Sequence, residues 1–259
     1  MEKVKVSIVQ MDIALGDPKK NRERAVSFIE EACRRGSNFV VLPELWTTGY
    51  SLENIHELAE PLDGTTITML LDICSKWKTH VIGSIAELRE GKIFNTAAVL
   101  GPEGVLGSYS KVHLFRLMDE HKYFTPGDSC AIFETSFGKV GLIICYDLRF
   151  PELTRKVALK GARILFVPAE WPYPRVAAWE LLLKARAIEN QMFVVAANRV
   201  GSDEKNTFFG HSMVLDPMGE VLVSGGDTEL ILTCELDMGL VDKTRSLIPC
   251  FEDRRPDLY

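Results

Sequence analysis

The stretch that most constrains the fold of this chain is KVGLIICYDLRFPE, at residues 139–152. Its apolar run, 140–144, predicts a buried strand that ends in Cys145. Pro151 and Glu152 suit the first turn of a helix, because proline fits there and an acidic side chain complements the helix dipole. A thiol is therefore expected on a sharp strand-to-helix turn, where the next backbone N–H would face a developing oxyanion. A buried structural cysteine explains this stretch alone equally well.

The composition is that of a soluble protein with a substantial core. The chain has 259 residues, 46% of them hydrophobic, and a formal net charge of −6, which disfavours a nucleic-acid or anionic-membrane surface. It has no signal-peptide pattern and no 18-residue apolar span. The six cysteines include no C-x-x-C pair, which favours reduced thiols over a disulfide framework or a zinc site. A cytoplasmic location is expected.

Strand and helix patterns alternate along the chain. Strands are predicted at 4–11, 39–42, 80–88, 95–100, 105–109, 131–134, 140–144, 164–167, 192–197, 210–216, 220–224 and 230–235. Helices are predicted at 18–35, 65–77, 152–160 and 175–190 and after 237, and a long loop at 111–127. This order predicts an α/β fold with mixed sheets, which two sheets packed face to face with helices outside would satisfy. Without a linker or a repeat, a single domain over 1–259 is expected.

Reactive side chains follow three of the predicted strands. Glu44 follows FVVLP, Lys111 follows GVLGSYS, and Cys145 follows KVGLII. Sites in open α/β proteins form at the carboxyl ends of strands, so these side chains can converge. A thiolate attacks a carbonyl or nitrile carbon, a carboxylate relays the proton, and an ammonium holds the oxyanion with the Tyr146 N–H. Such a site needs no metal and no cofactor, although Glu44 or Lys111 alone would more often be a surface charge.

Three segments resemble the signature regions of the nitrilase, or carbon–nitrogen hydrolase, superfamily. They are LPELWTTGY at 42–50, YSKVHLF at 109–115 and GLIICYDLRFPE at 141–152. The resemblance extends over essentially the whole chain through AEWP at 169–172, LLLKARAIENQ at 181–191 and GHSMVLDPMGEVL at 210–222. It implies a four-layer α-β-β-α sandwich with two mixed sheets, which dimerises into an αββα–αββα assembly.

The resemblance also implies the roles of the site residues. Glu44 would be the general base, Lys111 the oxyanion-stabilising residue and Cys145 the nucleophile, and a supporting second glutamate falls at Glu120. The chain is most similar to the Nit-type omega-amidases and to bacterial relatives linked to methionine salvage. These enzymes hydrolyse the terminal amide of small dicarboxylate monoamides such as 2-oxoglutaramate. A small amide substrate and a homodimer are therefore the expected partners.

Arg149 gives physical support to this substrate class. It lies four residues after Cys145, and a guanidinium can bind a substrate carboxylate bidentately. An internal salt bridge would remove that role, and the acidic candidates for it are Glu152, Glu170 and Asp147. In the Nit-type enzymes a stretch that typically reads AFNxTTGP supplies a threonine near the substrate. Here the stretch reads AEWPYP, so Trp171 or Tyr173 is expected to form that wall.

Large side chains near these segments are candidates for lining the pocket. They are Trp46, Tyr50, Phe115, Met118 and Trp171. Aromatic residues at such places belong as often to the core or to a dimer interface. His113 invites a Cys-His pair, but a lone histidine of this kind is more often a hydrogen-bonded structural residue. The helix at 175–190 would lie at the dimer interface of the family.

Other functions stay open at this point. A hydrolase of N-carbamoyl amines or N-carbamoyl amino acids, or a true nitrilase, would use the same residues, and Arg149 would suit a carboxylated carbamoyl substrate as well. A conventional Cys-His hydrolase would depend on His113. A catalytically idle binding or scaffold protein on the same fold would need no reactive thiol at Cys145.

Overall fold

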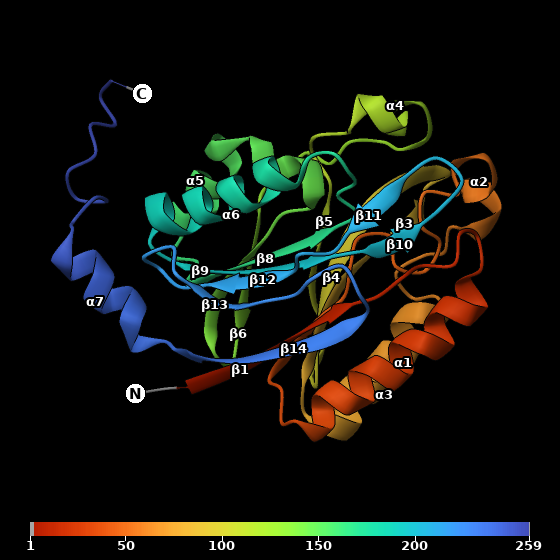
Figure 1. Ribbon diagram of the computed structural model, residues 1–259, viewed down its shortest axis with the longest axis horizontal. Coiled ribbons are helices and arrows are strands. Elements are labelled where there is room, and N and C mark those ends of the chain that lie inside the picture. The colour runs from red at the N-terminus through yellow and green to blue at the C-terminus, as the bar shows by residue number, and fades with distance from the viewer. Residues whose placement is uncertain (1–2, 259) are drawn as a thin grey trace.

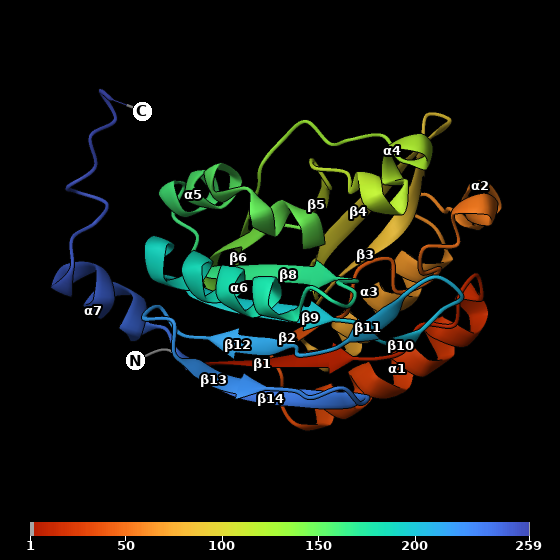
Figure 2. The same cartoon turned by 45° about the horizontal axis from the view of Figure 1, so that its top comes forward.

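Two mixed β-sheets packed face to face form the centre of the molecule, and helices cover both outer faces (Figure 1). The computed structural model describes residues 3–258. Central strands such as β8 (Ile164–Ala169) are buried along their whole length, because one face meets the other sheet and the other meets helices (Figure 2). The predicted α/β class, with two mixed sheets between outer helices, is confirmed.

The first sheet has the strand order β14-β1-β2-β3-β4-β5. Its strands are β1 (Lys3–Gln10), β2 (Phe39–Val41), β3 (His80–Arg89), β4 (Lys92–Gly101), β5 (Gly104–Ser110) and β14 (Leu230–Asp237). The second sheet has the order β13-β12-β9-β8-β7-β6. Its other strands are β6 (Ala131–Thr135), β7 (Gly138–Leu142), β9 (Phe193–Asn198), β12 (Met213–Leu215) and β13 (Val221–Ser224). The short strands β10 (Val200–Ser202) and β11 (Thr207–Phe209) pair separately.

The two large sheets share one pattern of strand direction. Three neighbouring strands run parallel in each, β1-β2-β3 in the first and β7-β8-β9 in the second. Antiparallel strands flank each parallel trio. The residues that follow β2, β7 and β8 therefore lie at carboxyl ends of parallel strands, which is where α/β proteins build their sites.

The longer helices lie on the outer faces of the sheets. The first sheet carries α1 (Pro18–Arg34) and α3 (Thr65–Trp77), and the second carries α5 (Pro151–Leu159) and α6 (Val176–Asn190) (Figure 2). The shorter helices are α2 (Ile55–Leu58), α4 (Glu120–Tyr123) and α7 (Gly239–Leu247), with 3₁₀ helices η1 (Leu52–Asn54), η2 (Arg116–Met118) and η3 (Cys145–Arg149). Within residues 3–258, no helix has both the length and the apolar character needed to cross a membrane.

Apolar side chains fill the space between the layers. One cluster lies between the two sheets and continues beneath α5 and α6, and Ile8, Phe39, Phe166 and Trp179 belong to it. A second cluster lies between the first sheet and the helices α1 and α3. The site described below is built where the strands leave this core.

Two strand boundaries differ from the predictions because backbone pairing sets them. Strand β7 ends at Leu142, and Cys145 opens η3 instead of ending the strand, since the pairing with β8 stops at Leu142. Strands β3 and β4 form one long hairpin, so β4 begins at Lys92 and not at residue 95.

Two other predicted segments were wrong in extent. The predicted loop at 111–127 contains η2 and α4. The predicted strand at 210–216 is reduced to β12, because Gly210 and His211 have φ angles of 72° and 51°, which interrupt extended backbone.

Candidate active site

Four predicted site residues meet at the ends of these strands. Glu44 lies after β2, Lys111 directly after β5, Glu120 at the start of α4 and Cys145 at the start of η3. Glu44, Lys111 and Glu120 are fully buried, and only the Cys145 residue retains some exposure, at 6%. The structure therefore brings these four side chains together in a site whose reachable group is the thiol.

The Lys111 ammonium is shared between two carboxyl groups. Its Nζ donates to Glu44 Oε1 at 2.7 Å and to Glu120 Oε1 at 2.6 Å. The Tyr50 hydroxyl lies between the same two groups and hydrogen-bonds to both. Asn95 Nδ2 donates to Glu44 Oε1 at 2.7 Å. The Glu170 backbone N–H donates to Glu44 Oε2 at 2.9 Å, so both oxygens of Glu44 are held in place.

The surroundings of each group in the cluster shift its pKa in a defined direction. Burial alone would raise the pKa of Glu44, but the Lys111 ammonium and the hydrogen bonds lower it overall. Burial raises the pKa of Glu120, and the charge of Glu44 adds to this against the opposing effect of Lys111. Burial would lower the pKa of Lys111, but the carboxyl groups raise it well above its ordinary value. Lys111 is therefore an ammonium, and Glu44 is the more acidic of the two carboxyl groups beside it.

The Cys145 thiol rests in its protonated form. Burial raises its pKa well above the ordinary value, and the charge of the hydrogen-bonded Glu44 carboxylate raises it further. The site thus holds an ionised carboxylate next to a neutral thiol. This pair can exchange a proton when a substrate arrives.

The backbone at Cys145 forms the sharp turn that the sequence predicts. Its φ angle is 44°, in the left-handed region, which costs a non-glycine residue roughly 1–2 kcal/mol. Helix α6 supports this turn, because Arg186 donates from Nε and Nη2 to the Leu148 carbonyl oxygen, at 3.0 and 2.7 Å. Strained turns of this kind expose a nucleophile at the edge of a sheet.

Asp147 connects the turn to the segment that carries Lys111. Its Oδ2 accepts hydrogen bonds from the Tyr109 hydroxyl at 2.7 Å and from the Ile144 N–H at 3.1 Å. Its Oδ1 accepts from the His113 N–H at 2.9 Å and lies 2.8 Å from His113 Nδ1. His113 therefore has the hydrogen-bonded place of a structural histidine. Tyr109 and His113 flank Lys111, so one buried carboxylate fixes the ammonium segment relative to the nucleophile.

A pocket opens over Cys145. Its other lining residues are Phe115, Tyr146, Arg149, Glu170, Trp171, Pro172 and Arg175. The Arg149 guanidinium carbon lies 4.8 Å from the centre of the Trp171 ring. Within residues 3–258 Arg149 forms no salt bridge, so none of the acidic side chains that were candidates for pairing occupies it.

Four candidate residues are not in the lining of this pocket, and one of them, Tyr50, is hydrogen-bonded in the Lys111 cluster. Trp46 is fully buried in the cluster beneath α1 and α3. Met118 lines a separate cavity of about 600 Å³ next to Tyr50. Tyr173 is 46% exposed and packs on Phe209, so Trp171 forms the wall that replaces the family's threonine stretch.

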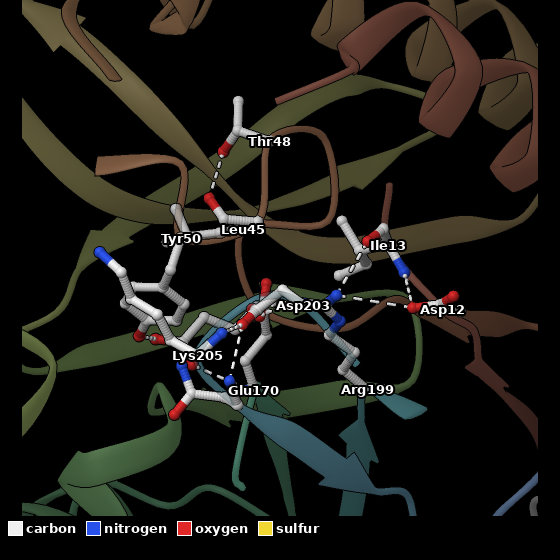
Figure 3. Close-up of polar contacts among 12 residues, drawn as sticks. Asp12, Ile13, Leu45, Thr48, Tyr50, Glu170, Arg199, Asp203 and Lys205 are labelled. Carbon is white, nitrogen blue, oxygen red and sulfur yellow. Dashed lines mark hydrogen bonds and ion pairs between the residues drawn. The ribbon is translucent and has the colours of Figure 1, made fainter. Parts of the chain in front are cut away.

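A second buried ion pair joins the pocket residue Glu170 to Arg199 (Figure 3). Glu170 Oε2 accepts a hydrogen bond from Arg199 Nη1 at 2.8 Å, and the same guanidinium donates to the Ile13 carbonyl oxygen at 2.9 Å. Figure 3 shows Arg199 extended between Glu170 and Asp12, with Asp203 beside the pair. Burial raises the pKa of Glu170 to about 8, although Arg199 opposes the shift. The Glu170 carboxyl group is thus paired with Arg199 and not with the arginines of the pocket.

Sequence reasoning did not assign Asn95, Glu170 or Arg175 to the site. A signal existed for Asn95, because a polar residue inside the apolar strand IFNTAAVL is expected to have a buried partner. Glu170 and Arg175 belong to the stretch that departs from the family pattern, where no motif gives them a role. Their positions follow from tertiary structure alone.

Comparisons with known proteins identify the family of the chain. The family model described as carbon-nitrogen hydrolase matches residues 5–246. The chain is 44% identical to the 2-oxoglutaramate amidase of Bacillus subtilis, over 98% of each protein. It is 36% identical to the omega-amidase NIT2 of Homo sapiens, over 100% of this chain and 98% of that protein. The crystal structure of XC1258 from Xanthomonas campestris, a CN-hydrolase superfamily protein, superimposes with a TM-score of 0.93 at 32% identity over 98% of each chain. The chain belongs to the carbon-nitrogen hydrolase family.

Proposed function

We propose that this enzyme hydrolyses the terminal amide of a small dicarboxylate monoamide, such as 2-oxoglutaramate, to the acid and ammonia. The observation that carries the proposal is the Arg149 guanidinium, which lies in the same pocket as Cys145 and has no acidic partner within residues 3–258. A substrate with a carboxylate at one end can bind Arg149 while its amide end reaches the thiol. The similarity to the amidases of Bacillus subtilis and Homo sapiens supports the same class.

The first half-reaction forms a thioester. The Glu44 carboxylate takes the proton of the Cys145 thiol as the sulfur attacks the amide carbon. The oxyanion that develops is held by Lys111 Nζ and by the Tyr146 backbone N–H. Glu44 then gives its proton to the amide nitrogen, the carbon–nitrogen bond breaks, and ammonia leaves. Glu120 supports these steps by holding Lys111 in place.

The second half-reaction restores the thiol. Glu44 takes a proton from a water molecule, whose oxygen attacks the thioester carbon, and the same two donors hold the new oxyanion. The carbon–sulfur bond breaks, and Glu44 returns the proton to the Cys145 sulfur. The carboxylic acid is released. No proton is gained or lost by the enzyme over the cycle.

The pocket residues hold the rest of the substrate. Arg149 would bind the carboxylate, and the aromatic walls formed by Phe115, Tyr146 and Trp171 would pack on the carbon chain between the two ends. A carbamoyl amino acid carries a carboxylate as well, so a hydrolase for such compounds is the second candidate. Release of carbon dioxide with the ammonia would identify it.

The test is ammonia release by the purified enzyme and by its Cys145→Ala variant. The substrates are 2-oxoglutaramate, succinamate, glutamine, an N-carbamoyl amino acid and an aliphatic nitrile. Turnover restricted to the monoamides and lost in Cys145→Ala is the expected result. Turnover of the carbamoyl compound or the nitrile alone would agree with Cys145 as the nucleophile but contradict the proposed substrate class. Wild-type rates in Cys145→Ala, or a Cys145 thiol no more reactive toward iodoacetamide than the other cysteines, would contradict the mechanism.

The organisation of the active enzyme is also a proposal. A single hydrolase domain over 1–259 is supported by the family match to residues 5–246. A homodimer that pairs through α6 is supported by the large apolar side chains that this helix exposes, Leu181 at 69% and Ile188 at 53%. A reducing compartment, such as the cytoplasm, is supported by the six cysteines, which are all free.

A further inference from the structure

The pocket over Cys145 contains a second guanidinium that the proposed reaction does not use. Arg175 immediately precedes α6 and lines the same pocket as Cys145 and Arg149. Its guanidinium carbon lies 5.4 Å from the centre of the Phe115 ring, and its Nη1 donates to the Tyr173 carbonyl oxygen at 3.3 Å. The two arginines therefore belong to different walls of one small pocket.

Trp171 contacts both arginine residues, Arg149 through its guanidinium and Arg175 through its backbone. Its ring lies under the Arg149 guanidinium, and its Nε1 donates to the Arg175 carbonyl oxygen at 3.2 Å. The same carbonyl accepts a hydrogen bond from the Trp179 N–H, at 3.1 Å, in the first turn of α6. The backbone at Arg175 is thus held from both sides. Its guanidinium makes only one hydrogen bond to the described protein, so most of its donors remain available to a ligand.

The charge of the pocket is not balanced by the protein. Within residues 3–258, neither Arg149 nor Arg175 forms a salt bridge. The acidic side chain in the lining, Glu170, is engaged by Arg199. A single substrate carboxylate satisfies one guanidinium bidentately. The second guanidinium calls for a further acceptor oxygen close to that carboxylate.

We infer that Arg175 is a specificity-determining residue that binds the 2-oxo group of the substrate, while Arg149 binds the neighbouring carboxylate. The substrate class is then a 2-oxo acid whose far end is the amide. Analogues of the same length without the oxo oxygen leave Arg175 without a ligand. This inference rests on the proposed function and deepens it, because it explains which monoamide the pocket prefers.

The experiment compares 2-oxoglutaramate with glutaramate, which differs from it only in lacking the oxo group. In Arg175→Gln, kcat/KM for 2-oxoglutaramate should fall about 10- to 100-fold, the effect of losing a hydrogen bond from a charged group. The fall for glutaramate should be no more than about threefold, since that substrate gives Arg175 nothing to bind. In Arg149→Gln, kcat/KM should fall to a similar degree for both substrates, because both carry the carboxylate.

Two controls distinguish binding of the oxo group by Arg175 from a structural effect of the substitution and from the loss of one positive charge. Arg116→Gln removes an exposed arginine of η2, outside the lining of the Cys145 pocket. It should leave kcat/KM unchanged for both substrates. Binding of 2-oxoglutarate and of glutarate to Cys145→Ala, with and without Arg175→Gln, measures the same preference without turnover. The preference for 2-oxoglutarate should disappear in the double variant.

Each outcome decides between the inference and the proposed function. Equal losses for both substrates in Arg175→Gln, or no loss for either, would overturn the role of Arg175 and leave the monoamidase standing. A wild-type enzyme that hydrolyses neither monoamide would overturn the proposed function and the inference with it. A preference for 2-oxoglutarate that survives in the double variant would assign the oxo group to another residue.

Discussion

At the scale of single residues, the pKa values of two similar glutamates in one buried cluster shift in opposite directions. Glu44 accepts hydrogen bonds on both oxygens, from two side-chain amine or amide groups, a hydroxyl and a backbone N–H, and its pKa is lowered overall. Glu120 shares the same ammonium, but burial and the charge of Glu44 raise its pKa. Glu44 is thus the more acidic carboxyl group and the one hydrogen-bonded to the Cys145 thiol, which makes it the candidate base.

The first prediction compares Glu44→Gln with Glu120→Gln. Glu44→Gln should lower kcat by about 10²–10⁴-fold, because the base is lost. Glu120→Gln should lower kcat by only about tenfold, since the amide oxygen can still accept the hydrogen bond from Lys111. Steady-state kinetics on 2-oxoglutaramate measure both, and circular dichroism confirms that each variant is folded. Equal losses in the two variants would show that Glu120 also transfers a proton.

The second prediction concerns the pH dependence of stability at Glu170. Its pKa rises from an ordinary value of 4.5 to about 8 in the folded protein. Between these values the folded state keeps a proton that the unfolded state releases, so stability falls as pH rises from about 4.5 to about 8. The contribution to the slope is at most about 1.4 kcal/mol per pH unit. Urea unfolding at pH 5, 6, 7 and 8 should show a shallower decline for Glu170→Gln. Parallel curves would contradict this.

At the scale of elements, the site depends on how β5 and η3 are held together. Lys111 follows β5 and Cys145 opens η3. The Asp147 carboxylate links the two segments, because it accepts hydrogen bonds from Tyr109 and His113 on one side and from Ile144 on the other. This arrangement fixes the distance from the ammonium to the sulfur without using either reacting group. Asp147 is therefore a positioning residue.

The third prediction tests that link with Asp147→Asn and His113→Ala. An amide accepts hydrogen bonds at one of its two ends only, so Asp147→Asn should destabilise the protein by about 1–3 kcal/mol and lower kcat more than it raises KM. His113→Ala should be impaired but active, since the backbone N–H of residue 113 still reaches Asp147. Chemical unfolding and kinetics give the comparison. Complete loss of activity in a folded His113→Ala would favour a Cys-His mechanism.

Some of the elements that build the site could be predicted from the sequence, and the positions of some side chains could not. The apolar runs before Glu44 and Cys145 predicted the strands β2 and β7, because buried strands leave a pattern in the sequence, although β7 ends three residues before Cys145. The position of the Trp46 side chain could not be predicted from such a pattern, since an indole fits equally well in the core or in the pocket. The sequence also contained no sign that Arg175 lines the pocket. Its place in the pocket depends on how α6 meets the second sheet, and this is a tertiary property.

At the scale of the whole molecule, α6 connects the catalytic turn to the surface. On its inner face Arg186 holds the Leu148 carbonyl, and its first residue follows Arg175 directly. On its outer face Leu181 and Ile188 are exposed. A partner that covers these side chains would also press the helix onto the turn. The proposed dimer would thus stabilise the geometry of the site from outside it.

The last prediction tests that coupling with Leu181→Glu. The wild-type enzyme should have twice the 29.0 kDa mass of the chain in multi-angle light scattering, and Leu181→Glu should shift it to the monomer, because a charge buried in an interface is costly. The control is Val105→Glu on β5, which places the same charge at another exposed apolar position, on the other sheet. It should remain dimeric and active.

The activity of the monomer decides whether the dimer matters to the chemistry. If α6 is braced by its partner, monomeric Leu181→Glu should lose kcat by about tenfold while its circular dichroism stays that of a folded protein, since a small displacement of the turn misaligns the sulfur and the ammonium. Full activity in the monomer would mean that dimerisation contributes to the stability of the protein but not to its catalysis. A monomeric wild-type enzyme would remove the dimer altogether, and the apolar face of α6 would then need a different partner.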